Sequence, residues 1–280
     1  MASEAIETLA FGYGLIEGPR LDAGDNLYFS DVHNGGVFRR APDGTIATVI
    51  PKRRGVGGIA LHAEGGLVVS GRDICHVREG ETRVLFAPEN TPGFNDLFTD
   101  RWGAVYAGTV RSDPFAQGGQ RTPGELWRIS GAGEATQVYD GVGLSNGIGF
   151  SPDERLLYHS DSAARAIYIS DVHGRGQVSG RRVFARVELG VPDGLAVDAE
   201  GGVWVAVFQG GCVARYRPDG SLERTLSVPA SAVTSLCFGG EGRQDLYIVT
   251  ADNSEAPERG GTIFRTRADV AGLPAPLARV

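Results

Sequence analysis

Four oxygen-bearing side chains stand at equivalent places in the sequence, each at the start of a short apolar run. They are Glu17 in IEGPRL, Asn95 in FNDLFT, Asn146 in SNGIGF and Asp193 in PDGLAV. Carboxylate and amide oxygens, without nitrogen or sulfur, are the ligands that a hard cation such as Ca²⁺ prefers. We therefore expect these residues to bind one divalent cation, with Ca²⁺ as the first choice and Mg²⁺, Mn²⁺ or Zn²⁺ as alternatives.

The same residue types also form ordinary turns, so position has to separate the two interpretations. Asn-Gly, Asp-Gly and Pro-Asp-Gly are common turn sequences. Asp43 and Asp219 lie in Pro-Asp-Gly turns that follow a predicted strand, whereas Asp193 precedes one. Four such placements in separate parts of the chain favour a shared site over four unrelated turns.

The apolar runs belong to a unit that recurs about six times. Each unit has a short apolar run, a turn and a second strand that ends in a small or polar residue. Repeats of roughly 40 to 50 residues with several short strands are typical of a β-propeller. The sequence predicts an all-β fold, a six-bladed β-propeller with a central metal site, as a single domain over residues 1–280. The units are read at 18–30, 58–70, 95–108, 146–160, 193–206 and 234–250.

The strand order within a unit predicts where the polar side chains lie. The fifth unit is expected to form strands at Gly194–Val197, Val203–Val207, Cys212–Tyr216 and Arg224–Val228. In an antiparallel blade, the start of the first strand and the loop between the second and third lie on the same face. The four polar residues should therefore converge near the axis on that face. The N-terminal segment Ala5–Ala10 is expected to complete the last blade and close the ring.

Loops on that face should surround the mouth of the site. The longest, Arg111–Gly124, is rich in Gly, Gln and Arg, and it is either a specificity loop or lid, or only a surface insertion. His159 is interpreted as a core residue and Asp161 as a hydrogen-bond acceptor in a turn. The substrate-binding residues expected in or beside these loops are His33, Phe94, Asn95, Phe115, Gln120 and Phe208.

Composition argues against several other classes of function. A net charge of −7 and a pI near 5.3 provide no basic surface for nucleic acid. No apolar run approaches the roughly 18 residues of a membrane span, and Met1–Thr8 lacks the features of a signal peptide. We expect a cytoplasmic protein with three reduced cysteines. Scattered histidines and the lack of a Gly-x-Ser-x-Gly motif indicate neither a zinc site nor a serine hydrolase.

Over nearly its whole length the chain resembles the senescence marker protein, gluconolactonase and luciferin-regenerating enzyme family. The resemblance implies a six-bladed propeller with one axial divalent cation, usually Ca²⁺, that serves hydrolysis of lactones and similar esters. It also implies that Glu17, Asn146 and Asp193 are metal ligands and that Asn95 lies close to metal and substrate. The matching stretches are Glu17–Pro19, Phe94–Asp96, Asn146–Gly147, Ser151–Asp153, Tyr158–Ser162, Pro192–Gly194, Val203–Ala206 and Val233–Gly239.

One position departs from the pattern of the family. Members that hydrolyse sugar lactones often carry Arg two residues before the Asn of the Phe-Asn-Asp motif, where it contacts substrate hydroxyls. In this chain that position is Gly93. Loss of a guanidinium that could bind vicinal oxygens argues against a polyhydroxylated sugar acid as substrate.

These observations predict a metal-dependent hydrolase of a lactone or small ester, with a small-molecule substrate. The cation would polarise the carbonyl, and Asp193 would act as a base or as a nucleophile, with Asn95 and Asn146 orienting water and substrate. Two alternatives remain open. One is hydrolysis of phosphotriester-like compounds, as in the similar propeller of diisopropyl fluorophosphatase, and the other is a non-enzymatic binding module with a structural cation. The oligomeric state is not predicted.

Overall fold

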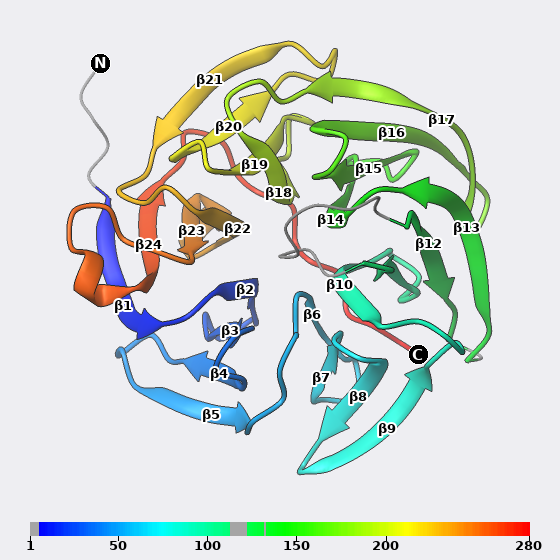
Figure 1. The fold of residues 1–280 in the computed structure, drawn as a ribbon, viewed down its shortest axis with the longest axis horizontal. Helices are drawn as coiled ribbons and strands as arrows, with labels where there is room; N and C mark the ends of the chain where they lie inside the picture. The colour runs from blue at the N-terminus through cyan, green and yellow to red at the C-terminus, as the bar shows by residue number, and fades with distance from the viewer. Residues whose placement is uncertain (1–5, 113–121, 132) are drawn as a thin grey trace.

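The protein is a ring of six four-stranded antiparallel sheets around a central axis (Figure 1). The computed structural model describes residues 6–112, 122–131 and 133–280. Consecutive strands pair with each other in every sheet, so each repeat of the sequence forms one blade. This arrangement confirms the predicted all-β, six-bladed propeller.

The innermost strand of each complete repeat is also its first in sequence. The first blade consists of β2 (Ile16–Leu21), β3 (Leu27–Asp31), β4 (Val37–Arg40) and β5 (Ile46–Ile50). The second consists of β6 (Ile59–Leu61), β7 (Leu67–Val69), β8 (Ile74–Arg78) and β9 (Glu81–Phe86). The third consists of β10 (Gly93–Thr99), β11 (Val105–Val110), β12 (Gly124–Ile129) and β13 (Ala135–Val142). The fourth consists of β14 (Ser145–Phe150), β15 (Leu156–Asp161), β16 (Ala166–His173) and β17 (Gln177–Arg186). The fifth consists of β18 (Val191–Val197), β19 (Val203–Phe208), β20 (Cys212–Tyr216) and β21 (Leu222–Ser227). The strands of the fifth blade match their predicted positions, with small shifts at the ends.

The last blade takes strands from both ends of the described chain. It consists of β22 (Val233–Gly239), β23 (Asp245–Thr250), β24 (Gly261–Arg267) and, on its outer edge, β1 (Glu7–Tyr13), with short 3₁₀ turns η1 (Glu241–Arg243) and η2 (Pro257–Arg259). β1 runs antiparallel to β24, and Arg265 binds the Glu7 carboxylate at 2.6 Å. The paired segment begins and ends later than the Ala5–Ala10 segment expected from sequence. This pairing joins the first and last repeats and closes the ring.

After β24 the chain crosses the face opposite the inner-strand starts, seen in Figure 1 as the red segment that passes behind the centre. It is held to several blades in turn by backbone hydrogen bonds. Leu273 N donates to Val197 O at 3.2 Å, Ala278 N to Leu61 O at 2.8 Å and Arg279 N to Gly103 O at 2.9 Å. Leu273 to Leu277 line a second cavity of about 830 Å³ at that end of the axis.

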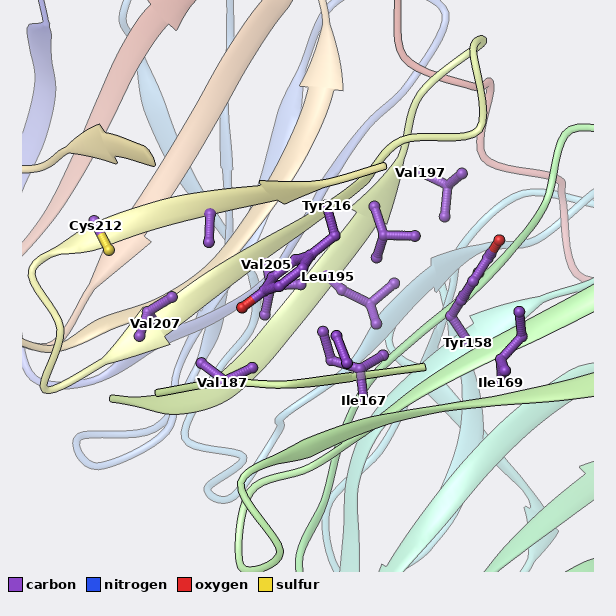
Figure 2. Packing of buried hydrophobic residues seen from close by; sticks show 13 residues of the cluster. Tyr158, Ile167, Ile169, Val187, Leu195, Val197, Val205, Val207, Cys212 and Tyr216 are labelled. Atoms are coloured by element: carbon purple, nitrogen blue, oxygen red, sulfur yellow. The ribbon is translucent and has the colours of Figure 1, made fainter. Parts of the chain in front are cut away.

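The hydrophobic core lies between neighbouring blades. Figure 2 shows Leu195 and Val205 of the fifth blade packed against Ile167 of the fourth. Because blades cover both faces of the inner strands, β19 is buried along almost its whole length, while the edge strand β21 is largely exposed. All three cysteines are free and buried. Over the described residues, the structure has no helix long and apolar enough to span a membrane.

Candidate active site

The four oxygen-bearing residues occupy the starts of four inner strands, where each strand contains a β-bulge. In β10, for example, Asn95 and Asp96 together face only Gly108, because Phe94 pairs with Thr109 and Leu97 with Ala107. A bulge puts two residues opposite one and turns a side chain out of the regular alternation. The same register shift occurs next to Glu17 in β2, at Asn146 in β14 and at Asp193 in β18. These bulges explain how side chains on well-paired strands reach the axis.

The second and sixth blades contribute no side chain to the set of four oxygen-bearing residues. At the equivalent place in the second blade stands Gly57, where a Cβ atom would lie 2.2 Å from Asn95 Oδ1. A side chain there would therefore displace the Asn95 amide. In the sixth blade, Thr234 donates its hydroxyl proton to the Ile16 carbonyl oxygen at 2.5 Å. That hydroxyl is used to join the sixth blade to the first.

A chain of hydrogen bonds fixes the two asparagines. Asn95 Nδ2 donates to Asn146 Oδ1 at 3.0 Å and to the Ser145 carbonyl oxygen at 2.9 Å. Asn146 Nδ2 donates to Ser162 Oγ at 3.0 Å, and the Ser162 hydroxyl donates to the Pro192 carbonyl oxygen at 2.6 Å. Both amide nitrogens are thus used as donors toward the protein, which leaves the amide oxygens as the groups able to bind a cation.

The two carboxylates of the set are buried with little hydrogen bonding. Asp193 is 7% exposed, and its Oδ1 atom has no hydrogen-bond partner in the part of the chain that the structure describes. Glu17 is 6% exposed, and its Oε2 accepts one long bond of 3.4 Å from the Gly18 amide. Burying an ionised carboxylate without a partner is strongly unfavourable. In its ionised form, each group would therefore require a counter-charge.

The pKa values of Glu17 and Asp193 also show that their ionised forms are unfavourable without a counter-charge. Burial, followed by the charges of Asp193 and Asp96, raises the pKa of Glu17 well above its usual value. Burial and then the Asp96 charge likewise raise the pKa of Asp193. A divalent cation would reverse both shifts, because it stabilises the ionised form of each neighbouring carboxylate.

Asp96 is a buried carboxylate that the sequence analysis did not select. Burial raises its pKa to about 6, opposed by the guanidinium of Arg20, whose Nη2 lies 3.7 Å from Asp96 Oδ1. If all three carboxylates are ionised, Arg20 compensates one of them and two negative charges remain. That remainder matches the charge of one divalent cation. The only sequence signal for Asp96 was its place beside Asn95 in the Phe-Asn-Asp motif.

The donor set defines what kind of ion could bind. Among the described residues, no three His, Cys, Asp or Glu side chains are placed to hold a metal ion together. A cation at this position would need the amide oxygens of Asn95 and Asn146 as well as the carboxylates of Glu17 and Asp193. An all-oxygen set with two amides suits Ca²⁺ better than zinc, which prefers nitrogen and sulfur ligands.

These residues lie on the floor of a cavity of about 910 Å³ that opens on the same face. Glu17, Asn95, Asn146 and Asp193 all line it, which brings the predicted metal set together in one place. Most of the wall is apolar, and it includes the predicted substrate contacts Phe94 and Phe208. Such a cavity, apolar with a few convergent polar groups, is typical of a small-molecule site.

Other predicted residues fall elsewhere. His33 is exposed and is not among the residues that line the cavity, whereas its neighbour Val32 is. Phe115 and Gln120 lie outside the described residues. Asp161 accepts hydrogen bonds from the amides of Gly143 and Leu144, which confirms its interpretation as a hydrogen-bond acceptor. His159 is fully buried, as expected for a core residue.

Comparisons with known proteins agree with this architecture. Residues 15–252 match the family described as "SMP-30/Gluconolactonase/LRE-like region". The chain is 34% identical to 6-deoxy-6-sulfogluconolactonase from Pseudomonas putida, over 90% of each chain. It is 30% identical to pentonolactonase XacC from Haloferax volcanii, over 89% of this chain and 88% of the other.

Similarity to solved structures extends over the same length. A luciferin-regenerating enzyme superposes with a TM-score of 0.89 at 25% identity, covering 99% of this chain and 100% of the other. The motifs, the six blades and the family match agree over most of the chain. The protein therefore belongs to the SMP-30, gluconolactonase and luciferin-regenerating enzyme-like family.

Proposed function

We propose that this protein is a lactone hydrolase that depends on one divalent cation, with Ca²⁺ as the first choice. The observation that carries the proposal is Asp193, a buried carboxylate on the floor of a large open cavity, with one oxygen that no described residue contacts by a hydrogen bond. The relatives named as lactonases support the reaction class, since they match nearly the whole chain. A site built only for structure would be closed by protein groups, and the cavity directly above Asp193 argues against that alternative.

Glu17, Asn146 and Asp193 would hold the cation, with Asn95 beside them. When bound, the cation supplies a positive charge that stabilises the oxygen of the scissile carbonyl. The protein keeps this position ready because the Asn95, Asn146 and Ser162 side chains orient one another.

Asp193 is the group best placed to act on the reaction itself. In one route, its free oxygen accepts a proton from water while the water oxygen bonds to the lactone carbonyl carbon. The ring carbon–oxygen bond then breaks, and the same proton is passed to the leaving oxygen to give the hydroxy acid. In the other route, Asp193 attacks the carbonyl carbon directly and water hydrolyses the resulting acyl group. Both routes require the carboxylate of Asp193.

The cavity wall favours a compact, partly apolar substrate. Phe94 and Phe208 form apolar surface above the carboxylates, with Leu15, Leu144 and Val191 nearby. These side chains can pack against the carbon face of a lactone ring and exclude water from its far side. The polar floor would then fix the orientation of the ester group.

The test is the isosteric variant Asp193→Asn, assayed on a panel of lactones with Ca²⁺ and with EDTA. We expect kcat to fall by at least about 100-fold in the variant, since a positioned proton acceptor or nucleophile contributes that much or more. Wild-type turnover should also be lost in EDTA and return with added Ca²⁺.

Asp219→Asn is a matched control, because it makes the same change in a second Pro-Asp-Gly sequence whose aspartate is exposed. This control should keep wild-type turnover. Wild-type rates in Asp193→Asn, or full activity in EDTA, would overturn the proposed role of the site.

A further inference from the structure

The cavity of the proposed active site carries two arginines on its rim that have no partner among the described residues. Arg54 lies in the segment between β5 and β6, and Arg72 in the loop between β7 and β8, and both line the cavity. Their side chains are exposed, and neither forms a hydrogen bond or ion pair with any residue that the structure describes. Two uncompensated positive charges therefore face the space above the carboxylate floor.

Neighbouring arginines behave differently. Arg53 binds the Asp73 carboxylate at 2.6 Å, and Arg111 binds Glu125 at 3.0 Å, and neither lines the cavity. Arg53 and Arg111 are thus neutralised by protein carboxylates, while Arg54 and Arg72 have no partner among the described residues. Arg54 and Arg72 are therefore available to bind an anion in the cavity.

The backbone explains why both charges lie beside the second blade. A Cβ atom at Gly93 would lie 2.8 Å from the Gly71 carbonyl oxygen, so a side chain there would clash with the backbone of the second blade. The same position lies 3.7 Å from the Cα atom of Arg72. A Cβ atom at Gly71 would in turn lie 3.3 Å from the Arg54 carbonyl oxygen. Arg72 and Arg54 therefore start from adjacent points beside Gly93, at one side of the mouth.

The geometry points to an anion subsite formed by Arg54 and Arg72, which selects lactones that carry a negatively charged substituent remote from the ring ester. This inference rests on the proposed lactonase function of the same cavity. The ester would lie at the carboxylate and amide floor, and a sulfonate, phosphate or carboxylate would bind the guanidinium groups at the rim. Guanidinium groups suit this role because they donate paired hydrogen bonds to such anions.

The charge distribution also assigns an orientation to the substrate. With one divalent cation bound, the floor that holds Glu17 and Asp193 carries no net charge, whereas the rim carries the positive charges of Arg54 and Arg72. An anionic substituent is therefore attracted to the rim beside the second blade. A neutral lactone with the same ring is not oriented by these charges.

The experiment compares gluconolactone with the same lactone bearing phosphate, or sulfonate, on its terminal carbon. Wild type, Arg54→Gln, Arg72→Gln and the double variant are assayed, with Arg155→Gln as the matched control, an exposed arginine in a turn on the opposite face. We expect each single variant to lower kcat/KM for the charged lactones by about tenfold, and the double variant by about 100-fold. Rates on gluconolactone should stay within about twofold in all variants.

Equal losses on neutral and charged lactones, or a wild type without preference for the charged compounds, would overturn the subsite while lactone hydrolysis stands. Calorimetric binding of glucose and of glucose phosphorylated on its terminal carbon gives a readout that needs no turnover. If no lactone is hydrolysed but the phosphorylated sugar binds more tightly in an arginine-dependent way, the subsite stands and the lactonase proposal fails. If no lactone is hydrolysed and the phosphorylated sugar does not bind more tightly, both the subsite and the lactonase proposal are wrong.

Discussion

Asp193 and Asp219 occupy the same tripeptide, Pro-Asp-Gly, in opposite environments. The Asp219 carboxylate is exposed and accepts hydrogen bonds from the hydroxyl and amide of Ser221, which lower its pKa. The Asp193 carboxylate is buried beside other acids, and its pKa is raised. The difference in burial and partners, rather than the local sequence, separates a turn residue from a site residue.

The fully buried histidine, His159, should make the stability of the protein depend on pH. His159 Nε2 lies 2.7 Å from Ser145 Oγ and Nδ1 lies 2.8 Å from Tyr139 Oη, and burial lowers its pKa to about 4. The unfolded chain, with a histidine pKa near 6.5, binds more protons in this window, so stability is complete above about pH 6.5 and falls as pH approaches 4. The histidine alone should remove about 2 kcal/mol of unfolding free energy between about pH 7 and 5.

Urea unfolding at both pH values measures this effect. The His159→Gln variant is expected to lose about 2 kcal/mol less than wild type over the same interval. The exposed His173 provides the control, and His173→Gln should retain the wild-type pH dependence. Equal pH dependence in His159→Gln and wild type would contradict the assignment of a neutral buried histidine.

At the scale of the strand, the β-bulges determine which residues reach the axis. The alternation of apolar residues and the turn signals were enough to place the inner strands and the four polar positions, including Asn146 and Asp193. The bulges themselves were not predicted, because one extra residue in a strand depends on cross-strand pairing that local sequence does not encode. Asp96 was not predicted for the same reason, because regular alternation would place its side chain on the opposite face of the strand from that of Asn95.

Long-range contacts account for the remaining differences between sequence and structure. The unpaired state of Arg54 and Arg72 depends on the absence of nearby acids from other loops in the described chain, which a linear pattern cannot show. The course of the segment after β24 depends on backbone hydrogen bonds to distant strands, such as the bond from Ala278 N to Leu61 O. These bonds carry no side-chain signature in the sequence.

The outer strand β1 should contribute strongly to stability because it covers the edge of β24. Deletion of Met1–Ala10 removes more than half of the paired residues of β1 and exposes the core around Ala10 and Ile263. We expect the melting temperature to drop by about 5 °C or more. A chain that begins at Ile6 keeps β1 and should melt within about 1 °C of the full chain. Equal melting temperatures for both deletions would show that closure by β1 is unimportant.

The molecule as a whole has two different ends along its axis. One end opens as the cavity above the carboxylates and amides, and the other is crossed by the segment that follows β24. A ligand of the carboxylate and amide floor would approach through the cavity that opens above it. The proposed order along its path is positive rim, apolar wall and negative floor.

The proposed site requires one cation held by residues of four blades, and calorimetric titration of the cation-free protein with Ca²⁺ measures that binding. We predict one bound Ca²⁺ per chain in wild type and in Asp219→Asn, and at least a 100-fold weaker affinity, about 3 kcal/mol, in Asp193→Asn. Absence of Ca²⁺ binding in wild type, or unchanged binding in Asp193→Asn, would contradict the account.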